Sequence, residues 1–285
     1  MKNETQEVDM FELPEFMTLA RQMNDSLKAK TVQRGQLGNS PQKFVWYNRT
    51  HEEFDRLTKG KTVGEAYARG KWLFVPLEPG YVLLLGECGG KALYHPSGTK
   101  VPKKYHLYIT FENDSFFTVT TQMWGAMELY EKGEEQGRKY VEGMRTTPIE
   151  PEFTFAYFSE LIDELIDGKK RSAKALLTQD QIIPGLGNAI AQDILFKAHL
   201  HPRHMVADLT ADQRQVLYHA ITDTVGEVTE MGGRYDEYDL YNNPGGYIRK
   251  MDKNAVGRPC PECGVTIEKI QYLGGACYVC PNCQK

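Results

Sequence analysis

Four cysteines near the end of the sequence have the spacing of a metal site. Cys260 and Cys263 are separated by two residues, as are Cys280 and Cys283, and sixteen residues lie between the pairs. Two such knuckles can present four thiolates tetrahedrally, the geometry that Zn²⁺ prefers. Because the first residues are polar and form no signal-peptide core, we expect a zinc ribbon and not two disulfides. Cys277 and Cys280 have the same spacing, so it stays open whether Cys277 takes the place of Cys283 as a ligand.

A glycine-rich turn is the second candidate for chemistry. Pro184-Gly185-Leu186-Gly187-Asn188 runs directly into an apolar stretch that predicts a helix. Glycines let a backbone approach a phosphate closely, and the unpaired amides at a helix start point toward it. An ordinary turn between two helices, with Asn188 as the N-cap, explains the same residues. The turn alone leaves both interpretations open.

The N-terminal half must position any site there through a helix and a set of strands. Apolar residues at helical spacing predict a helix over residues 13–28. From residue 32 to about 127, short apolar runs separated by turns predict strands, among them a hairpin of residues 105–111 and 116–121. We expect a β-sandwich with a leading helix over residues 10–131, after a flexible extension at residues 1–9.

The C-terminal half has a different pattern. Residues 132–151 are charged, contain prolines and show no sustained period, which indicates a linker. Helical periodicity follows in residues 152–245, where Thr210 and Gln213 form a capping-box pattern. The ribbon then takes residues 246–285. The sequence therefore predicts an α+β multidomain protein.

Composition limits the class of protein further. With 285 residues and 41% hydrophobic content, the chain can fill two cores. No apolar run approaches the roughly 18 residues of a membrane helix, so we expect no membrane partner and a cytoplasmic location. We also expect a monomer. The net charge of −4 argues weakly against a nucleic-acid partner, but basic residues outnumber acidic ones from Tyr241 onward.

Four stretches, in the same order, resemble one known family. The run from Lys174 to Asn188 resembles the helix-two-turn-helix motif of the formamidopyrimidine-DNA glycosylases and endonuclease VIII enzymes, and a four-cysteine finger follows at that family's distance. The opening Met10-Phe-Glu-Leu-Pro-Glu is similar to the family's Met-Pro-Glu-Leu-Pro-Glu, and Arg69-Gly-Lys-Trp-Leu matches a lysine-bearing strand. The likeness covers residues 10–285. It implies a base excision repair protein that binds duplex DNA, damaged or abasic, in a cleft between the two domains.

The resemblance fails at the nucleophile. In that family an N-terminal proline amine attacks the sugar C1′ of a damaged nucleotide and forms a Schiff base, whereas here the matching residue is Phe11, preceded by ten residues. An amide nitrogen has no basic lone pair for this step. DNA glycosylase and AP lyase activity therefore stays open. The alternatives are a non-catalytic lesion-binding protein and a zinc-ribbon regulator that binds nucleic acid.

Several residues still match functional positions of the family. Glu12 matches its acid/base glutamate and Glu15 the companion, although two carboxylates near a helix start also favour its positive end. Lys71 matches the lysine that reaches a DNA phosphate, and it is the best substitute amine. Phosphate-gripping positions of the helical motif fall on Lys174, Gly187 and Asn188.

The loops that handle the lesion depart more from the family. Family enzymes insert side chains into the space left by a flipped nucleotide. The matching loops here offer Cys88, Gln122, Met123 and Trp124, of which Trp124 is suited to stack on bases. The finger arginine of the family is replaced by Gly274-Gly275, which removes one expected phosphate contact.

Overall fold

The computed structural model describes residues 10–39, 44–166 and 170–285. The extension predicted for residues 1–9 lies outside them. Two compact units are present. One contains the described residues up to Gly143 together with Thr229–Tyr247, and the other contains Met144–Val228 and Ile248–Lys285.

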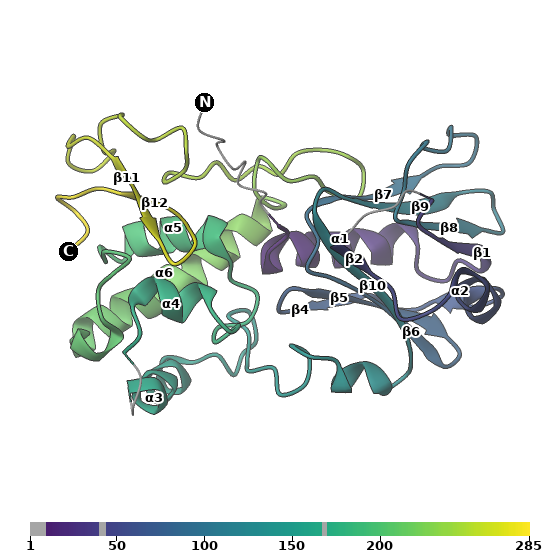
Figure 1. Ribbon diagram of the computed structural model, residues 1–285, viewed down its shortest axis with the longest axis horizontal. Coiled ribbons are helices and arrows are strands. Elements are labelled where there is room, and N and C mark those ends of the chain that lie inside the picture. Colours follow the sequence, from purple (N-terminus) through teal and green to yellow (C-terminus); the bar gives the residue numbers. More distant parts are fainter. Residues whose placement is uncertain (1–9, 40–43, 167–169) are drawn as a thin grey trace. The chain divides into compact units, whose positions relative to one another are not determined.

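The first unit is a two-sheet sandwich with the predicted leading helix (Figure 1). One sheet has the order β1-β8-β9-β7 and the other β2-β10-β6-β5-β3, with β4 paired to β5. The elements are α1 (Leu13–Ser26), β1 (Val32–Leu37), β2 (Phe44–Trp46), α2 (His51–Thr58), β3 (Thr62–Val63), β4 (Tyr67–Arg69), β5 (Trp72–Glu78), β6 (Tyr81–Gly86), β7 (Gly90–His95), β8 (Leu107–Phe111), β9 (Phe116–Thr121), β10 (Trp124–Glu131) and the 3-10 turn η1 (Glu134–Gly137). Helix α2 was not predicted.

The start of α1 is fixed by its own sequence. Glu12 and Glu15 form a capping box, in which the Glu12 amide donates to Glu15 Oε2 at 2.8 Å. Pro14 is tolerated because the first turn needs no amide donor. The apolar face of α1, with Phe16, Leu19 and Met23, is buried in the core of this unit. The sandwich thus holds two carboxylates at one helix end.

The second unit contains the helices and the ribbon. Its elements are α3 (Phe155–Ile166), α4 (Ala173–Thr178), α5 (Asn188–Lys197), the 3-10 turn η2 (Val206–Asp208), α6 (Ala211–Glu230), β11 (Glu268–Tyr272) and β12 (Gly275–Val279). The capping box before α6 is confirmed, since the Gln213 amide donates to Thr210 Oγ1 and the Thr210 amide to Gln213 Oε1. Gly187, and not Asn188, is the N-cap of α5.

Residues 229–247 group with the first compact unit, although the residues before them belong to the second. The expected domain boundaries, with residues 152–245 in one helical domain, stay a prediction. Leu240 is buried in the sandwich core, and its carbonyl accepts a hydrogen bond from the Tyr94 amide at 2.9 Å. A single leucine in a polar stretch carries no periodicity, so the sequence pattern does not reveal this return.

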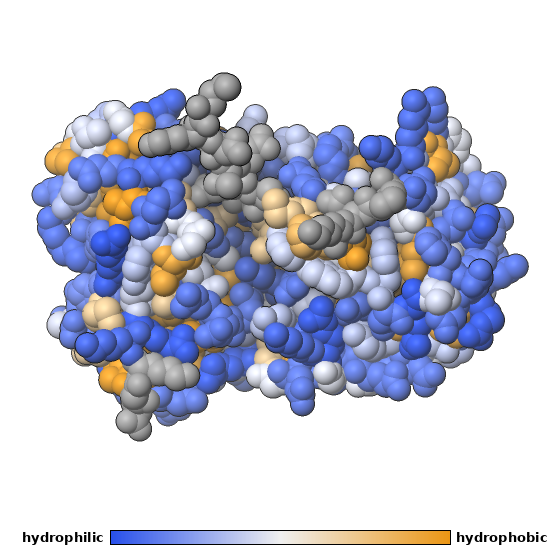
Figure 2. Space-filling model, in the orientation of Figure 1, coloured by the Kyte–Doolittle hydropathy of each residue, from blue (hydrophilic) through white to orange (hydrophobic). Residues whose placement is uncertain are grey.

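Among the described residues, no helix combines the length and the apolar character needed to cross a bilayer. On the face drawn in Figure 2, hydrophilic side chains predominate and hydrophobic residues form separate patches.

Candidate functional site

The four predicted cysteine ligands come together in the second unit. The Sγ atoms of Cys260, Cys263, Cys280 and Cys283 all lie within 4.8 Å of one another. The Cys263–Cys280 and Cys260–Cys283 pairs are 3.4 and 3.9 Å apart. A tetrahedral site with Zn–S bonds of about 2.3 Å has sulfur atoms about 3.8 Å apart, so these four fit. Cys277 is buried within β12 and is not part of this group.

Helix α5 holds the ribbon through buried polar side chains. Gln192 Nε2 donates to the Ala276 carbonyl at 3.2 Å, and the Tyr278 amide donates to Gln192 Oε1 at 3.2 Å. The carboxylate of Asp193 accepts from the Lys250 and Met251 amides at 3.0 and 2.8 Å. Both side chains are buried, so these bonds replace lost water contacts and fix the ribbon on the helix.

Lys174, Asn188 and the ribbon turn meet at one place. Lys174 Nζ donates to the Tyr272 carbonyl at 2.8 Å. A Cβ atom on Gly275 would lie 3.5 Å from Lys174 Nζ and 3.6 Å from Asn188 Oδ1. However, Lys174 is only 2% exposed. It holds the ribbon turn, and the phosphate contact expected for it stays a prediction.

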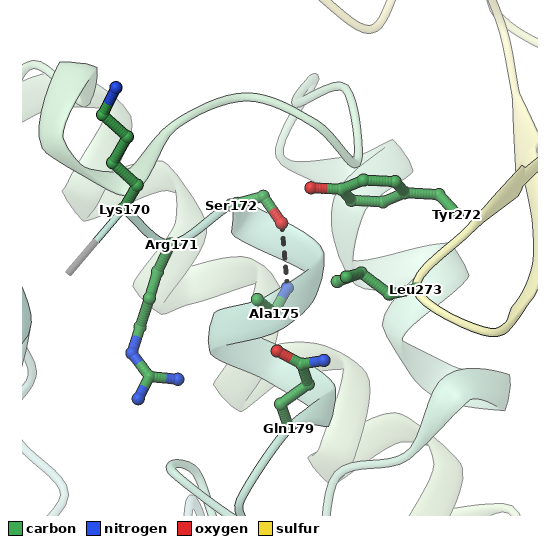
Figure 3. Close-up of a pocket in the computed structure, with 7 residues that line it drawn as sticks. All are labelled: Lys170, Arg171, Ser172, Ala175, Gln179, Tyr272 and Leu273. Carbon is green, nitrogen blue, oxygen red and sulfur yellow. Dashed lines mark hydrogen bonds between the residues drawn. The ribbon is translucent and has the colours of Figure 1, made fainter.

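A shallow pocket lies beside this junction (Figure 3). It is lined by Lys170, Arg171, Ser172, Ala175, Gln179, Tyr272 and Leu273. The hydroxyl of Ser172 accepts from the Ala175 amide at 3.2 Å and caps α4. Lys170 and Arg171 extend in different directions, and Arg171 faces Asp180 at 3.5 Å. The pocket therefore has a basic rim, but its arginine is already paired.

The first unit contains a buried charge cluster at the start of α1. Arg234, from the segment that returns to the sandwich, has no exposed surface, and Glu15 is 3% exposed. The Arg234 guanidinium donates to Glu15 Oε1 from Nε at 3.1 Å and to Oε2 from Nη2 at 3.2 Å. Glu237 lies 3.6 Å from Nη2. Burial alone would lower the pKa of Arg234, and the surrounding carboxylates, Glu15 foremost, outweigh it and raise the pKa above its ordinary value.

Phe11, at the position of the family's nucleophile, is buried in the same region. Its side chain is 1% exposed and stacks edge-to-face on Phe16. Its amide nitrogen donates to the Cys88 carbonyl at 2.9 Å, and Arg234 Nη2 donates to the carbonyl of Met10 at 2.7 Å. Hydrogen bonds therefore hold both the Met10 carbonyl and the Phe11 amide. Phe11 has an amide nitrogen at the position where the family has an amine.

Lys71 is the amine that faces this cluster. It lies in the turn between β4 and β5 and is partly exposed. Burial lowers its pKa from 10.5, the positive charge of Arg234 acts in the same direction, and the charge of Glu12 opposes both. A neutral amine is the form that attacks an aldehyde, so this environment favours reactivity.

The expected lesion-handling residues fall into two groups. Trp124 begins β10, is 37% exposed, and stacks with Phe44 and Trp46 at centroid distances of 4.5 and 5.5 Å. Gln122 and Met123 precede it on the surface. Cys88 differs, because it is 4% exposed within the sandwich core and burial raises its thiol pKa to about 12. In this conformation it has no surface to insert into DNA.

Arg234 and Glu237 were missed in the sequence. Both lie in the run Gly233-Arg-Tyr-Asp-Glu-Tyr-Asp, which resembles an ordinary charged loop. The only signal is an arginine next to two glycines, and that pattern is too common to predict burial.

Two family descriptions match the chain in the expected order. The formamidopyrimidine-DNA glycosylase N-terminal domain matches residues 10–127, and the H2TH domain of the same enzymes matches residues 145–237. The chain belongs to the formamidopyrimidine-DNA glycosylase family. The match to the N-terminal domain means that the likeness at Met10–Glu15 is not accidental, which removes the support for a ribbon-only regulator.

Relatives of this family align along nearly the whole chain. A formamidopyrimidine-DNA glycosylase of Bacillus cereus is 27% identical, with 96% of this chain and 99% of the relative covered. One from Lactobacillus delbrueckii subsp. bulgaricus is 29% identical, with 97% and 100% covered.

Solved structures share the fold. The MutM (Fpg) protein from Thermus thermophilus superposes with a TM-score of 0.80 at 24% identity, covering 96% of this chain and 98% of that one. The Lactococcus lactis Fpg, solved in complex with DNA containing an abasic site, gives 0.83 at 21% identity, covering 96% and 99%.

Proposed function

We propose that the protein binds duplex DNA at abasic or otherwise damaged positions, as a glycosylase-like member of base excision repair. Family membership over both domains supports this, as does the Lactococcus lactis relative in complex with abasic-site DNA. The partly exposed Trp124 offers a ring for base stacking, and the Asn188 turn offers phosphate contacts. We further propose that it acts as a monomer in the cytoplasm, where thiolates stay reduced.

Binding is tested by titrating intact duplex and duplex with a tetrahydrofuran abasic analogue at several salt concentrations. We expect tighter binding to the abasic duplex and a steep loss of affinity with salt, because phosphate contacts release counterions. Trp124→Ala should weaken mainly the abasic complex, by about 1–3 kcal/mol, the typical contribution of one aromatic–base stack. Affinity that does not change with salt would contradict the proposal, and so would equal affinity for both duplexes.

We propose zinc as the metal of the four-cysteine group. The donor set is all thiolate, which suits Zn²⁺, and the sulfur spacing fits a tetrahedron. With four protein ligands the site has no open position, so the metal stabilises the ribbon and takes no part in a reaction. The ribbon then holds its turn against Lys174.

For chemistry, we propose that Lys71 forms a Schiff base with the aldehyde of an abasic site. The observation that carries this is the pairing of an amide at Phe11, already hydrogen-bonded to the Cys88 carbonyl, with Lys71, a partly exposed residue whose amine feels the charge of Glu12. The Nζ lone pair bonds to C1′ of the open-chain sugar, and water leaves as the imine forms. Loss of the C2′ proton then breaks the C3′–oxygen bond to phosphate, and hydrolysis of the imine returns the amine. Glu12 is the nearby base for the C2′ proton.

Borohydride trapping tests this step, since reduction of the imine joins protein and DNA covalently. We expect trapping on an abasic duplex, its loss in Lys71→Ala, and a rate that rises with pH as the Lys71 ammonium loses its proton. Because burial lowers that pKa from 10.5, the rise should begin below the range of an ordinary lysine. A protein blocked at its first residue is the control for the terminal amine. Trapping that persists in Lys71→Ala would contradict the assignment.

Removal of oxidised bases should be weak or absent in the same assay with an 8-oxoguanine duplex. The family's attacking group is replaced by an amide at Phe11 that is hydrogen-bonded to Cys88. Lesion binding without any trapping would instead support the second candidate, a non-catalytic protein that marks or shields damage.

A further inference from the structure

Two of the three tryptophans in the chain lie exposed and next to each other in the sandwich unit. Trp46 and Trp124 both have exposed side chains, whereas Trp72 is buried. A tryptophan ring carries a large apolar surface and is usually well buried. Met123, which precedes Trp124, is exposed as well. A single exposed apolar residue needs no explanation, but a contiguous group of them marks a binding surface.

Strand pairing places the two indole rings together. β2 pairs in parallel with β10 at the end of its sheet (Figure 1), with Phe44 opposite Trp124 and Trp46 opposite Ala126. Residues two apart on a strand share one face, so Phe44, Trp46 and Trp124 point to the same side of the sheet. The planes of the Trp46 and Trp124 rings are inclined by only 22° at their centroid distance of 5.5 Å. The backbone ladder thus holds two broad rings nearly parallel.

The size of this exposed group decides which partner it fits. Its members, Trp46, Met123 and Trp124, are 37–41% exposed. An aromatic side chain carries about 150–250 Å² of surface, so the three residues together leave roughly 300 Å² or less open to solvent. Each partner in a stable protein complex buries about 800 Å². The group is therefore too small for a stable protein interface, whereas a nucleobase is a flat ring that stacks on a single aromatic side chain.

We propose that Trp46 is a second base-stacking residue beside Trp124, and that the two indoles bind two neighbouring bases that have lost their pairing. This inference rests on the proposed function, in which Trp124 stacks on a base at the damaged position. Bases inside an intact duplex are stacked on both faces, so an indole reaches a base face only where the duplex is open. A single abasic position leaves a gap one base thick, which one indole fills. The preferred substrate is therefore DNA in which an unpaired nucleotide lies directly beside the abasic position.

The first test measures affinity for three duplexes: one intact, one with a tetrahydrofuran abasic analogue, and one with an unpaired adenine directly beside that analogue. The wild type should bind the third about tenfold more tightly than the second, the effect of one added stack. Trp46→Ala should lose this preference, and Trp46→Phe, which keeps a ring, should retain most of it. Tyr140→Ala removes another exposed ring of the sandwich unit and should bind like the wild type. A tenfold preference that persists in Trp46→Ala would overturn the proposal.

A second measurement reports stacking itself and separates it from structural support of Trp124. The unpaired adenine is replaced by 2-aminopurine, whose fluorescence falls when the base stacks on an aromatic ring. The wild type should quench this fluorescence, and Trp46→Leu should not, because leucine fills space without offering a ring face. Quenching by Trp46→Leu equal to that of the wild type would mean that Trp46 only supports Trp124.

The two proposals fail separately. A wild type that prefers the abasic duplex to the intact one, but gains nothing from the unpaired base, keeps the proposed function and loses the second stack. A wild type that binds the intact and abasic duplexes equally removes the proposed function itself. Sedimentation that shows a dimer of the wild type, dissociated by Trp46→Ala, would overturn the base-stacking role and assign this surface to a second copy of the chain.

Discussion

The cysteine group and the charge cluster differ in how the chain assembles them. The four cysteines lie between residues 260 and 283, and their spacing alone places them together. The charge cluster joins the start of α1, the turn at Lys71 and the segment at Arg234, with partners 219 residues apart. A site within one short segment can be predicted from its pattern. A site made from three distant segments depends on the whole sandwich.

Their stabilities also have different sources. The ribbon has a small core around Ile267 and Tyr278, so a bound metal would contribute much of its folding free energy. The charge cluster is buried in the sandwich unit, where the Arg234 guanidinium pairs with the Glu15 carboxylate. Loss of one cysteine ligand should therefore unfold the ribbon alone. Loss of one charged side chain from the cluster should lower the free energy of unfolding of the sandwich.

The largest effect is expected for substitution of a cysteine ligand, which tests whether the ribbon depends on its metal in a way that the sandwich does not. Cys283→Ser should abolish stoichiometric zinc and disorder the ribbon, because metal binding contributes about 10–16 kcal/mol to small zinc domains. Cys277→Ser is the matched control and should keep its metal, since Cys277 lies outside the group. Metal analysis by mass spectrometry decides. Zinc retained in Cys283→Ser and lost in Cys277→Ser would reverse the ligand assignment.

The next effect concerns the buried arginine. Arg234→Met should lower the free energy of unfolding by about 3–5 kcal/mol, because it leaves buried carboxylates without a cation. Lys28→Met removes a surface ion pair with Glu65 in the same unit and should cost less than about 1 kcal/mol. Urea denaturation, monitored by a signal from the sandwich unit, measures the free energy of unfolding of both variants. Equal, small losses would mean that the cluster is no more stabilising than a surface pair.

Much of the fold follows from periodicity. The helix at residues 13–28, the strands on either side of the Glu-Pro-Gly turn, and the capping box at Thr210 were predicted and found. Helix α2 was missed although Thr50 and Glu53 form a capping box, because only Phe54 and Thr58 of its eight residues are buried. A helix this short carries too few apolar residues to show a period.

Parts of the candidate site could be predicted in two ways, from cysteines that repeat at short spacing and from the family resemblance. The resemblance supplied Glu12, Glu15 and Lys71, and in the structure all three interact with the charge of Arg234. Their partner Arg234 could not be foreseen, since a single charged residue in a polar loop gives no sign of burial. The phosphate contact that the family resemblance implies for Lys174 stays a prediction. Its hydrogen bond to the Tyr272 carbonyl could not be foreseen, because that residue lies 98 positions away in the chain.

The smallest effect is expected at Lys174 and tests whether its contact with a distant part of the chain stabilises the ribbon. Lys174→Met removes the donor to the Tyr272 carbonyl and should destabilise the ribbon turn by about 1–3 kcal/mol, the cost of a buried unsatisfied acceptor. Faster hydrogen exchange at residues 272–276 would report this. Lys269→Met changes the net charge equally on the exposed face of β11 and should leave the exchange unchanged. Both variants should bind DNA more weakly, but only Lys174→Met should lose affinity through a loosened turn, equally for intact and abasic duplexes. Unchanged exchange in Lys174→Met, with an affinity loss equal to that of Lys269→Met, would mean that Lys174 contributes only its charge.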